Sequence, residues 1–69
     1  MTLDELKPGE SARITGMNVD DTTLKPITMG IVEGSTISCM TKMYQTIEFN
    51  VYGTHIAISK HTAKKFDCE

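Results

Sequence analysis

The chain has 69 residues and carries seven Lys and Arg residues against nine Asp and Glu residues, which gives a formal net charge of −2. One domain covering residues 1–69 is expected, because a chain of this length cannot enclose a second hydrophobic core. Hydrophobic residues make up 39% and charged residues 23%, as in globular proteins and unlike disordered or fibrous ones. The negative net charge argues against nucleic acid as a partner, because a phosphate backbone attracts basic surfaces.

No segment of the sequence indicates export or membrane insertion. Residues 1–6 include Asp4 and Glu5, where a signal peptide needs a basic start and a long apolar run. No stretch approaches the roughly 20 apolar residues that cross a bilayer. The two cysteines, Cys39 and Cys68, are too few for a disulfide scaffold. We therefore expect a cytoplasmic domain without direct membrane insertion, whose thiols stay reduced.

The N-terminal segment predicts one helical turn followed by a strand. Thr2 and Glu5 have the spacing of a capping box, and Pro8-Gly9 favours a type II turn that reverses the chain. From residue 10 to residue 17 apolar and polar side chains alternate. This period of two is typical of a strand with one face in solvent.

The next segment has the period of a short helix. Leu24, Ile27 and Ile31 recur every three or four residues. Pro26 within a helix would lose a hydrogen bond and clash with the preceding turn. We therefore expect the regular helix to begin near Pro26, where the missing N–H is harmless, and to end at Gly30.

Period-two alternation returns in the second half of the chain. The expected strands are residues 35–41, residues 46–52, a segment containing Ile56 and Ile58, and residues 66–68, with a helical turn at residues 61–65. Five short strands with one wet face each cannot form two good sheets in 69 residues. Closing them into a barrel would remove the exposed edges. The predicted fold class is therefore mainly β, a small β-barrel of about five strands with a short helical insertion.

Several short motifs follow one another in a fixed order along the chain. They are Leu3–Glu10 (LDELKPGE), Ala12–Met17 (ARITGM), Met29–Ile31 (MGI), Glu33–Ser35 (EGS), Val51–Gly53 (VYG), Ile56–Ile58 (IAI) and Ala63. In this order they resemble the FeoA family, ferrous iron transport protein A, over nearly the whole chain. Residues 24–27 depart from the family pattern, because they contain one Lys and a Pro where basic residues and a leucine are usual.

The resemblance implies an SH3-like β-barrel that is not an enzyme. It implies a small cytoplasmic accessory protein of ferrous iron uptake, which binds and modulates the FeoB membrane transporter. An alternative with the same fold is a metal-responsive regulatory module related to the SH3-like domains of iron-dependent repressors, although no DNA-reading helix pair is present. A nucleic-acid-binding function is the least favoured alternative. Tyr44 and Tyr52 are the aromatic residues expected to face solvent and could stack on bases, but acidic residues accompany them.

The helical insertion is the expected partner-binding segment, through Leu24, Lys25, Ile27 and Met29. Leu24 and Lys25 precede the expected helix and should be exposed. Ile27 and Met29 have a competing interpretation as a plug over one end of the barrel. Methionine also suits irregular apolar contacts with a partner.

No metal, cofactor or catalytic site is expected. Structural zinc sites use four thiolate or imidazole ligands, usually in close pairs, and Cys39 and Cys68 fall on inward strand positions that favour core thiols. A weak surface site at His61, or at Asp67 and Glu69 with Cys68, is the remaining alternative. The sequence contains neither a matched nucleophile and base nor a phosphate-binding glycine loop.

Overall fold

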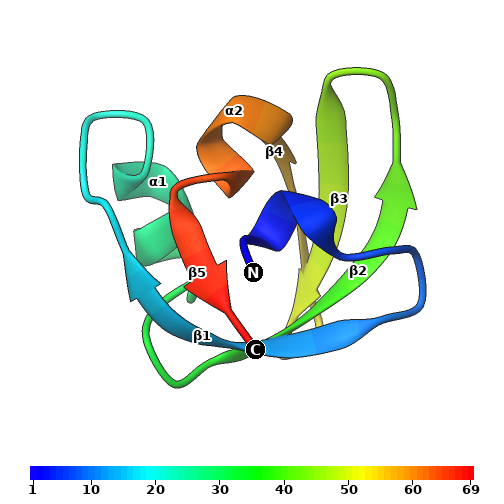
Figure 1. Ribbon diagram of the computed structural model, residues 1–69, viewed down its shortest axis with the longest axis horizontal. Helices are drawn as coiled ribbons and strands as arrows, with labels where there is room; N and C mark the ends of the chain where they lie inside the picture. The colour runs from blue at the N-terminus through cyan, green and yellow to red at the C-terminus, as the bar shows by residue number, and fades with distance from the viewer.

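The computed structural model describes residues 1–69 as one five-stranded antiparallel sheet with three short helical segments (Figure 1). In chain order the elements are the 3-10 helix η1 (Leu3–Glu5), β1 (Ser11–Met17), α1 (Leu24–Thr28), β2 (Thr36–Lys42), β3 (Thr46–Val51), β4 (Thr54–Ser59), α2 (Lys60–Ala63) and β5 (Phe66–Cys68). The strand order is β4-β3-β2-β1-β5. The predicted mainly β fold class, with about five strands and a short helical insertion, is confirmed.

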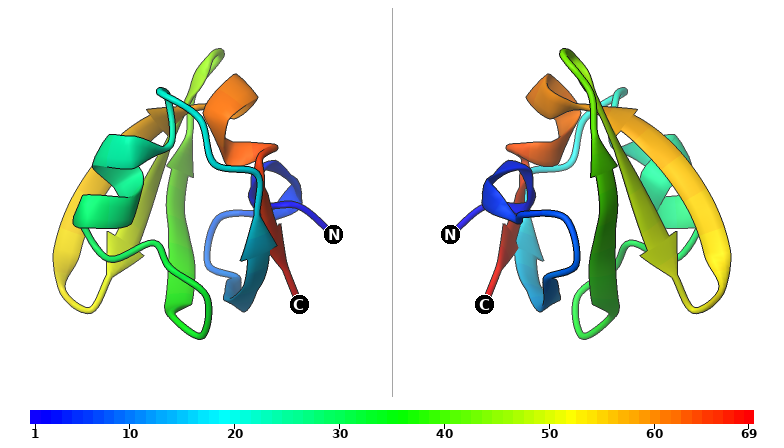
Figure 2. Two further views of the ribbon diagram at one scale, coloured as in Figure 1. Left: turned by 90° about the vertical axis from the view of Figure 1, so that its left-hand side faces the viewer. Right: turned by 90° about the vertical axis from the view of Figure 1, so that its right-hand side faces the viewer.

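The sheet curls around its own core, but its hydrogen-bonded ladder does not close. β4 and β5 stand at the two ends of the strand order, and no ladder joins them. α2 connects these two strands, and it contacts η1 across the opening of the curled sheet (Figures 1 and 2). The expectation that closure removes every strand edge is therefore wrong, because β4 and β5 are linked through α2 and not through a hydrogen-bonded ladder. None of the helices is long and apolar enough to cross a membrane.

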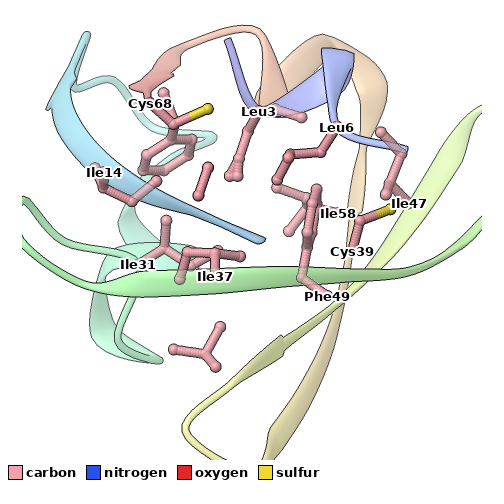
Figure 3. Packing of buried hydrophobic residues seen from close by; sticks show 14 of the residues in the cluster. Leu3, Leu6, Ile14, Ile31, Ile37, Cys39, Ile47, Phe49, Ile58 and Cys68 are labelled. Carbon is pink, nitrogen blue, oxygen red and sulfur yellow. The ribbon is translucent and has the colours of Figure 1, made fainter. Parts of the chain in front are cut away.

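One cluster of 15 buried apolar residues fills the space inside the curled sheet. Strand β3 follows the predicted alternation, since Ile47, Phe49 and Val51 are each at most 2% exposed. Leu3 and Leu6 enter the cluster from the η1 end (Figure 3). A period of two along each strand therefore supplies one apolar side chain in every second position to a single core.

Helix α1 begins two residues before the predicted start, at Leu24. Its first intrahelical bond runs from the Ile27 N–H to the Thr23 carbonyl at 3.0 Å. Pro26 lies in the first helical turn, where backbone N–H groups have no intrahelical partner, so its missing donor costs nothing. The helix ends before Gly30 as expected, and Gly30 has φ +108°.

Candidate functional site

A groove lies between α1 and β4, and Figure 2 shows the helix alongside this strand. The groove has a volume of about 230 Å³. Its lining residues are Lys25, Pro26 and Met29 from the α1 segment, and His55, Ile56, Ala57 and Ile58 from β4. One wall of the groove is thus helix α1, and the other is strand β4, which stands at one end of the strand order.

The four residues predicted to bind a partner divide between the surface and the core. Leu24 is 53% exposed and Lys25 is also exposed, as expected. Ile27 and Met29 are half-buried and pack against the core cluster, which agrees with the interpretation as a plug. The groove brings together Lys25 and Met29 only, while Leu24 and Ile27 lie outside its lining.

Sequence reasoning missed the β4 wall of the groove. The alternation correctly placed Ile56 and Ile58 toward the core, where they are 6% and 9% exposed. It did not show that their strand is the end strand of the sheet. Strand order depends on which segments pair across the sequence, so no local pattern could have identified this wall.

The entry to α1 is tied to the other end of the chain through a polar cluster. The Lys65 Nζ forms an ion pair with the Asp20 carboxylate and donates to the Thr22 Oγ1 at 2.8 Å. The same carboxylate accepts from the Thr22 N–H at 2.8 Å, and the Thr23 hydroxyl, which is fully buried, donates to the Asp20 carbonyl at 3.0 Å. The hydrogen bond from Lys65, followed by that from Thr22, holds the pKa of Asp20 well below its usual range. These bonds tie the segment just before α1 to the connection between α2 and β5.

The two cysteines are core residues, as predicted. Cys39 and Cys68 are each 2% exposed and free, and they lie at opposite sides of the buried cluster (Figure 3). Burial raises the pKa of both thiols, because the thiolate is poorly solvated there. Cys68 points into the core while Asp67 and Glu69 are exposed, so the alternative C-terminal metal cluster does not converge. No group of three or more His, Cys, Asp or Glu side chains is arranged to hold a metal ion.

The FeoA domain model matches residues 1–68 of the chain. The chain belongs to the FeoA family. The family membership that the ordered motifs indicated is thereby confirmed. FeoA proteins are small accessory proteins associated with ferrous iron transport, and they are not a known enzyme family.

Solved FeoA structures share this fold. Iron(II) transport protein A from Clostridium thermocellum is 28% identical with a TM-score of 0.90, over 100% of this chain and 44% of that chain. The FeoA-like protein from Clostridium acetobutylicum is 24% identical with a TM-score of 0.86, over 100% of this chain and 84% of that chain. Stenotrophomonas maltophilia FeoA, complexed with zinc and described as a prokaryotic SH3 domain protein, is 22% identical with a TM-score of 0.89, over 100% of this chain and 89% of that chain. The SH3-like character of the fold is thus confirmed. Comparison with curated proteins found no match.

Proposed function

We propose that this FeoA chain is a cytoplasmic, non-enzymatic accessory of ferrous iron uptake. It binds the cytosolic domain of a FeoB-type membrane transporter through the α1 surface and so modulates transport. Family membership supports the link to ferrous iron transport. The S. maltophilia relative is described as a candidate bacterial ferrous iron transport activating factor, which supports a regulatory role.

The exposed Leu24 side chain is the observation that carries the proposal. It is 53% exposed on a helix whose other apolar residues, Pro26 and Ile27, are buried and half-buried respectively. The polar cluster at Asp20 holds the helix start against Lys65, so Leu24 is presented from a restrained backbone. Such a side chain can be buried by a partner with little loss of backbone freedom, which favours binding.

Calorimetry with the purified FeoB cytosolic domain, with and without guanine nucleotide, tests this proposal. Burying a leucine contributes about 1.5–3 kcal/mol, so Leu24→Asp should weaken binding by at least tenfold. Met43→Asp is the matched control, because Met43 is 48% exposed and lies on the β2–β3 connection away from α1. Wild-type affinity in a folded Leu24→Asp protein, or equal losses in both variants, would contradict the α1 surface.

Met29→Asp should also remove binding, since Met29 is part of the same surface. Met29 is half-buried against the core, so this variant requires a far-UV circular dichroism spectrum that matches wild type before its affinity is interpreted. A folded Met29→Asp protein that binds normally would limit the surface to the exposed start of α1.

A further inference from the structure

The outer edge of β4 has unpaired backbone groups. The Lys60 N–H donates to the Gln45 carbonyl at 2.9 Å, which identifies a hydrogen-bonded pair at the end of the β3–β4 ladder. Hydrogen-bonded and non-hydrogen-bonded pairs alternate in an antiparallel ladder. The backbone N–H and C=O groups of His55, Ala57 and Ser59 therefore point away from β3. The backbones of His55 and Ala57 and the Ser59 N–H make no hydrogen bond in a turn, a loop or a cap, or with a side chain, whereas the Ser59 carbonyl is the N-cap acceptor of α2.

The other end of the sheet is covered. The Cys68 N–H on β5 donates to the Met1 carbonyl at 2.8 Å, and Thr2 forms an isolated antiparallel bridge with Asp67. The N-terminus thus pairs with the free side of β5. β4 is left as the end strand whose outer edge has no backbone partner, and such an edge is a template for strand addition.

The groove beside this edge has the size and lining for side chains of an added strand. Pro26 and Met29 form its helix wall, and Ile56 and Ile58 border it from β4. Its volume of about 230 Å³ is below the roughly 300–1,000 Å³ of small-molecule pockets. A peptide that pairs with β4 could place alternate side chains in the groove, as in β-strand addition.

Charge selects among the possible occupants. Lys25 and His55 line the groove and no acidic residue does, while Lys60 follows directly after β4. A second copy of this chain would place a second Lys25 at the same edge, which like-charge repulsion disfavours. An acidic segment would instead find complementary charge.

We propose that an extended acidic segment of a partner protein binds between β4 and α1 as a sixth strand. Its backbone pairs with His55, Ala57 and the Ser59 N–H, its apolar side chains enter the groove beside Ile56 and Ile58, and its carboxylates lie at the rim of the groove near the exposed Lys25. This inference deepens the proposed function and rests on it in one respect, namely that the partner is a protein of iron uptake. It names the kind of segment that the groove receives.

Titration of the ¹⁵N-labelled chain with a defined peptide tests the inference. The probe is an acetylated and amidated decapeptide of alternating valine and glutamate, and its control carries lysine in place of each glutamate. The glutamate peptide should shift the amide signals of β4 and α1. At saturation it should slow amide hydrogen exchange at His55, Ala57 and Ser59 by at least about tenfold, because those donors become paired.

Two protein variants and one modified peptide separate charge from backbone pairing. Lys25→Glu should weaken binding of the glutamate peptide by about three- to tenfold, whereas Lys7→Glu, an exposed lysine outside the groove, should not change it. Ala57→Pro removes one outward N–H without removing a ladder bond, as proline does on edge strands, and it should weaken binding at least fivefold. If Ala57→Pro does not fold, a glutamate peptide N-methylated along one edge should show the same loss with the unmodified protein.

Equal affinity for the lysine peptide, equal affinity for the N-methylated peptide, or amide changes confined to other elements would overturn the inference. So would self-association through the β4 edge that the glutamate peptide does not displace, measured by sedimentation. If no peptide binds but Leu24→Asp still weakens FeoB binding, the edge inference fails and the proposed function stands. If the peptide binds β4 but FeoB does not bind the chain, the proposed function fails and the acidic-strand site remains.

Discussion

Gly30 is the position at which a single methyl group should disturb both the fold and the site. It ends α1 with φ +108°, and a Cβ atom there would lie 3.0 Å from the Cγ1 of Val51, a buried residue at the end of β3. Gly34 supplies a matched control, because its φ is +92° but a Cβ atom there would have no neighbour within 4 Å. Alanine at either position strains the backbone, and only at position 30 does its Cβ atom also clash with a buried side chain.

The two effects have different magnitudes. A left-handed backbone costs an L-residue about 1–2 kcal/mol, so Gly34→Ala should lower the free energy of unfolding by that amount. Overpacking adds about 1–3 kcal/mol, so Gly30→Ala should lower it by about 2–5 kcal/mol in total. A domain of this size has a total stability of about 3–10 kcal/mol. The melting temperature should fall by about 4–8 °C for each kcal/mol, and Gly30→Ala should therefore leave a marginal protein.

Urea unfolding followed by far-UV circular dichroism measures both variants, and a double-mutant cycle with Val51→Ala isolates the contact. Shortening Val51 removes the methyl group that the new Cβ would meet, so Gly30→Ala should cost less in the Val51→Ala background. Gly34→Ala should cost the same in both backgrounds. Equal losses for the two glycine variants, or no coupling between Gly30 and Val51, would refute the steric argument.

Three further predictions concern the core, the polar cluster and the thiols. Phe49→Ala should cost about 3–5 kcal/mol and largely unfold the chain at 37 °C, whereas Phe49→Leu should stay folded in the same urea titration; a cooperative wild-type transition for Phe49→Ala would contradict this. The pKa of Asp20 is lower in the folded chain than in the unfolded chain, so its stabilisation is present above about pH 4 and is lost as pH falls further. Asp20→Asn should lower the melting temperature at pH 7 and flatten its decline below pH 4, and an unchanged acid profile would remove the role of the Lys65 ion pair. Cys39 and Cys68, with raised thiol pKa values, should react with Ellman's reagent only after unfolding in urea, and rapid reaction of the native chain would show that the core opens.

Much of the local structure was predictable from sequence periodicity. The alternation in residues 46–52 placed Ile47, Phe49 and Val51 in the core, where they are found. Helix α1 was expected near Pro26 and ended at Gly30, but it began two residues early. The start differs because the whole first turn of a helix, and not only its first position, tolerates a missing N–H.

The candidate site was only partly predictable. Leu24 and Lys25 were expected at the surface and are exposed there. Ile27 packs against the core instead of joining them, because a helix laid on a sheet must turn one side inward. His55 and Ala57 entered the site only through the position of their strand.

The sequence by itself determined where the chain extends and turns, which side chains are apolar enough to be buried, and which family the order of motifs matches. Those properties are local, since a period of two or of about 3.6 residues is readable within one segment. Only the tertiary structure decided that β4 ends the sheet, that the N-terminus covers β5, and that α1 leaves a groove beside an unpaired edge. Those properties depend on hydrogen bonds between segments far apart in the chain, and alternation is the same whether a strand is paired on one edge or on both.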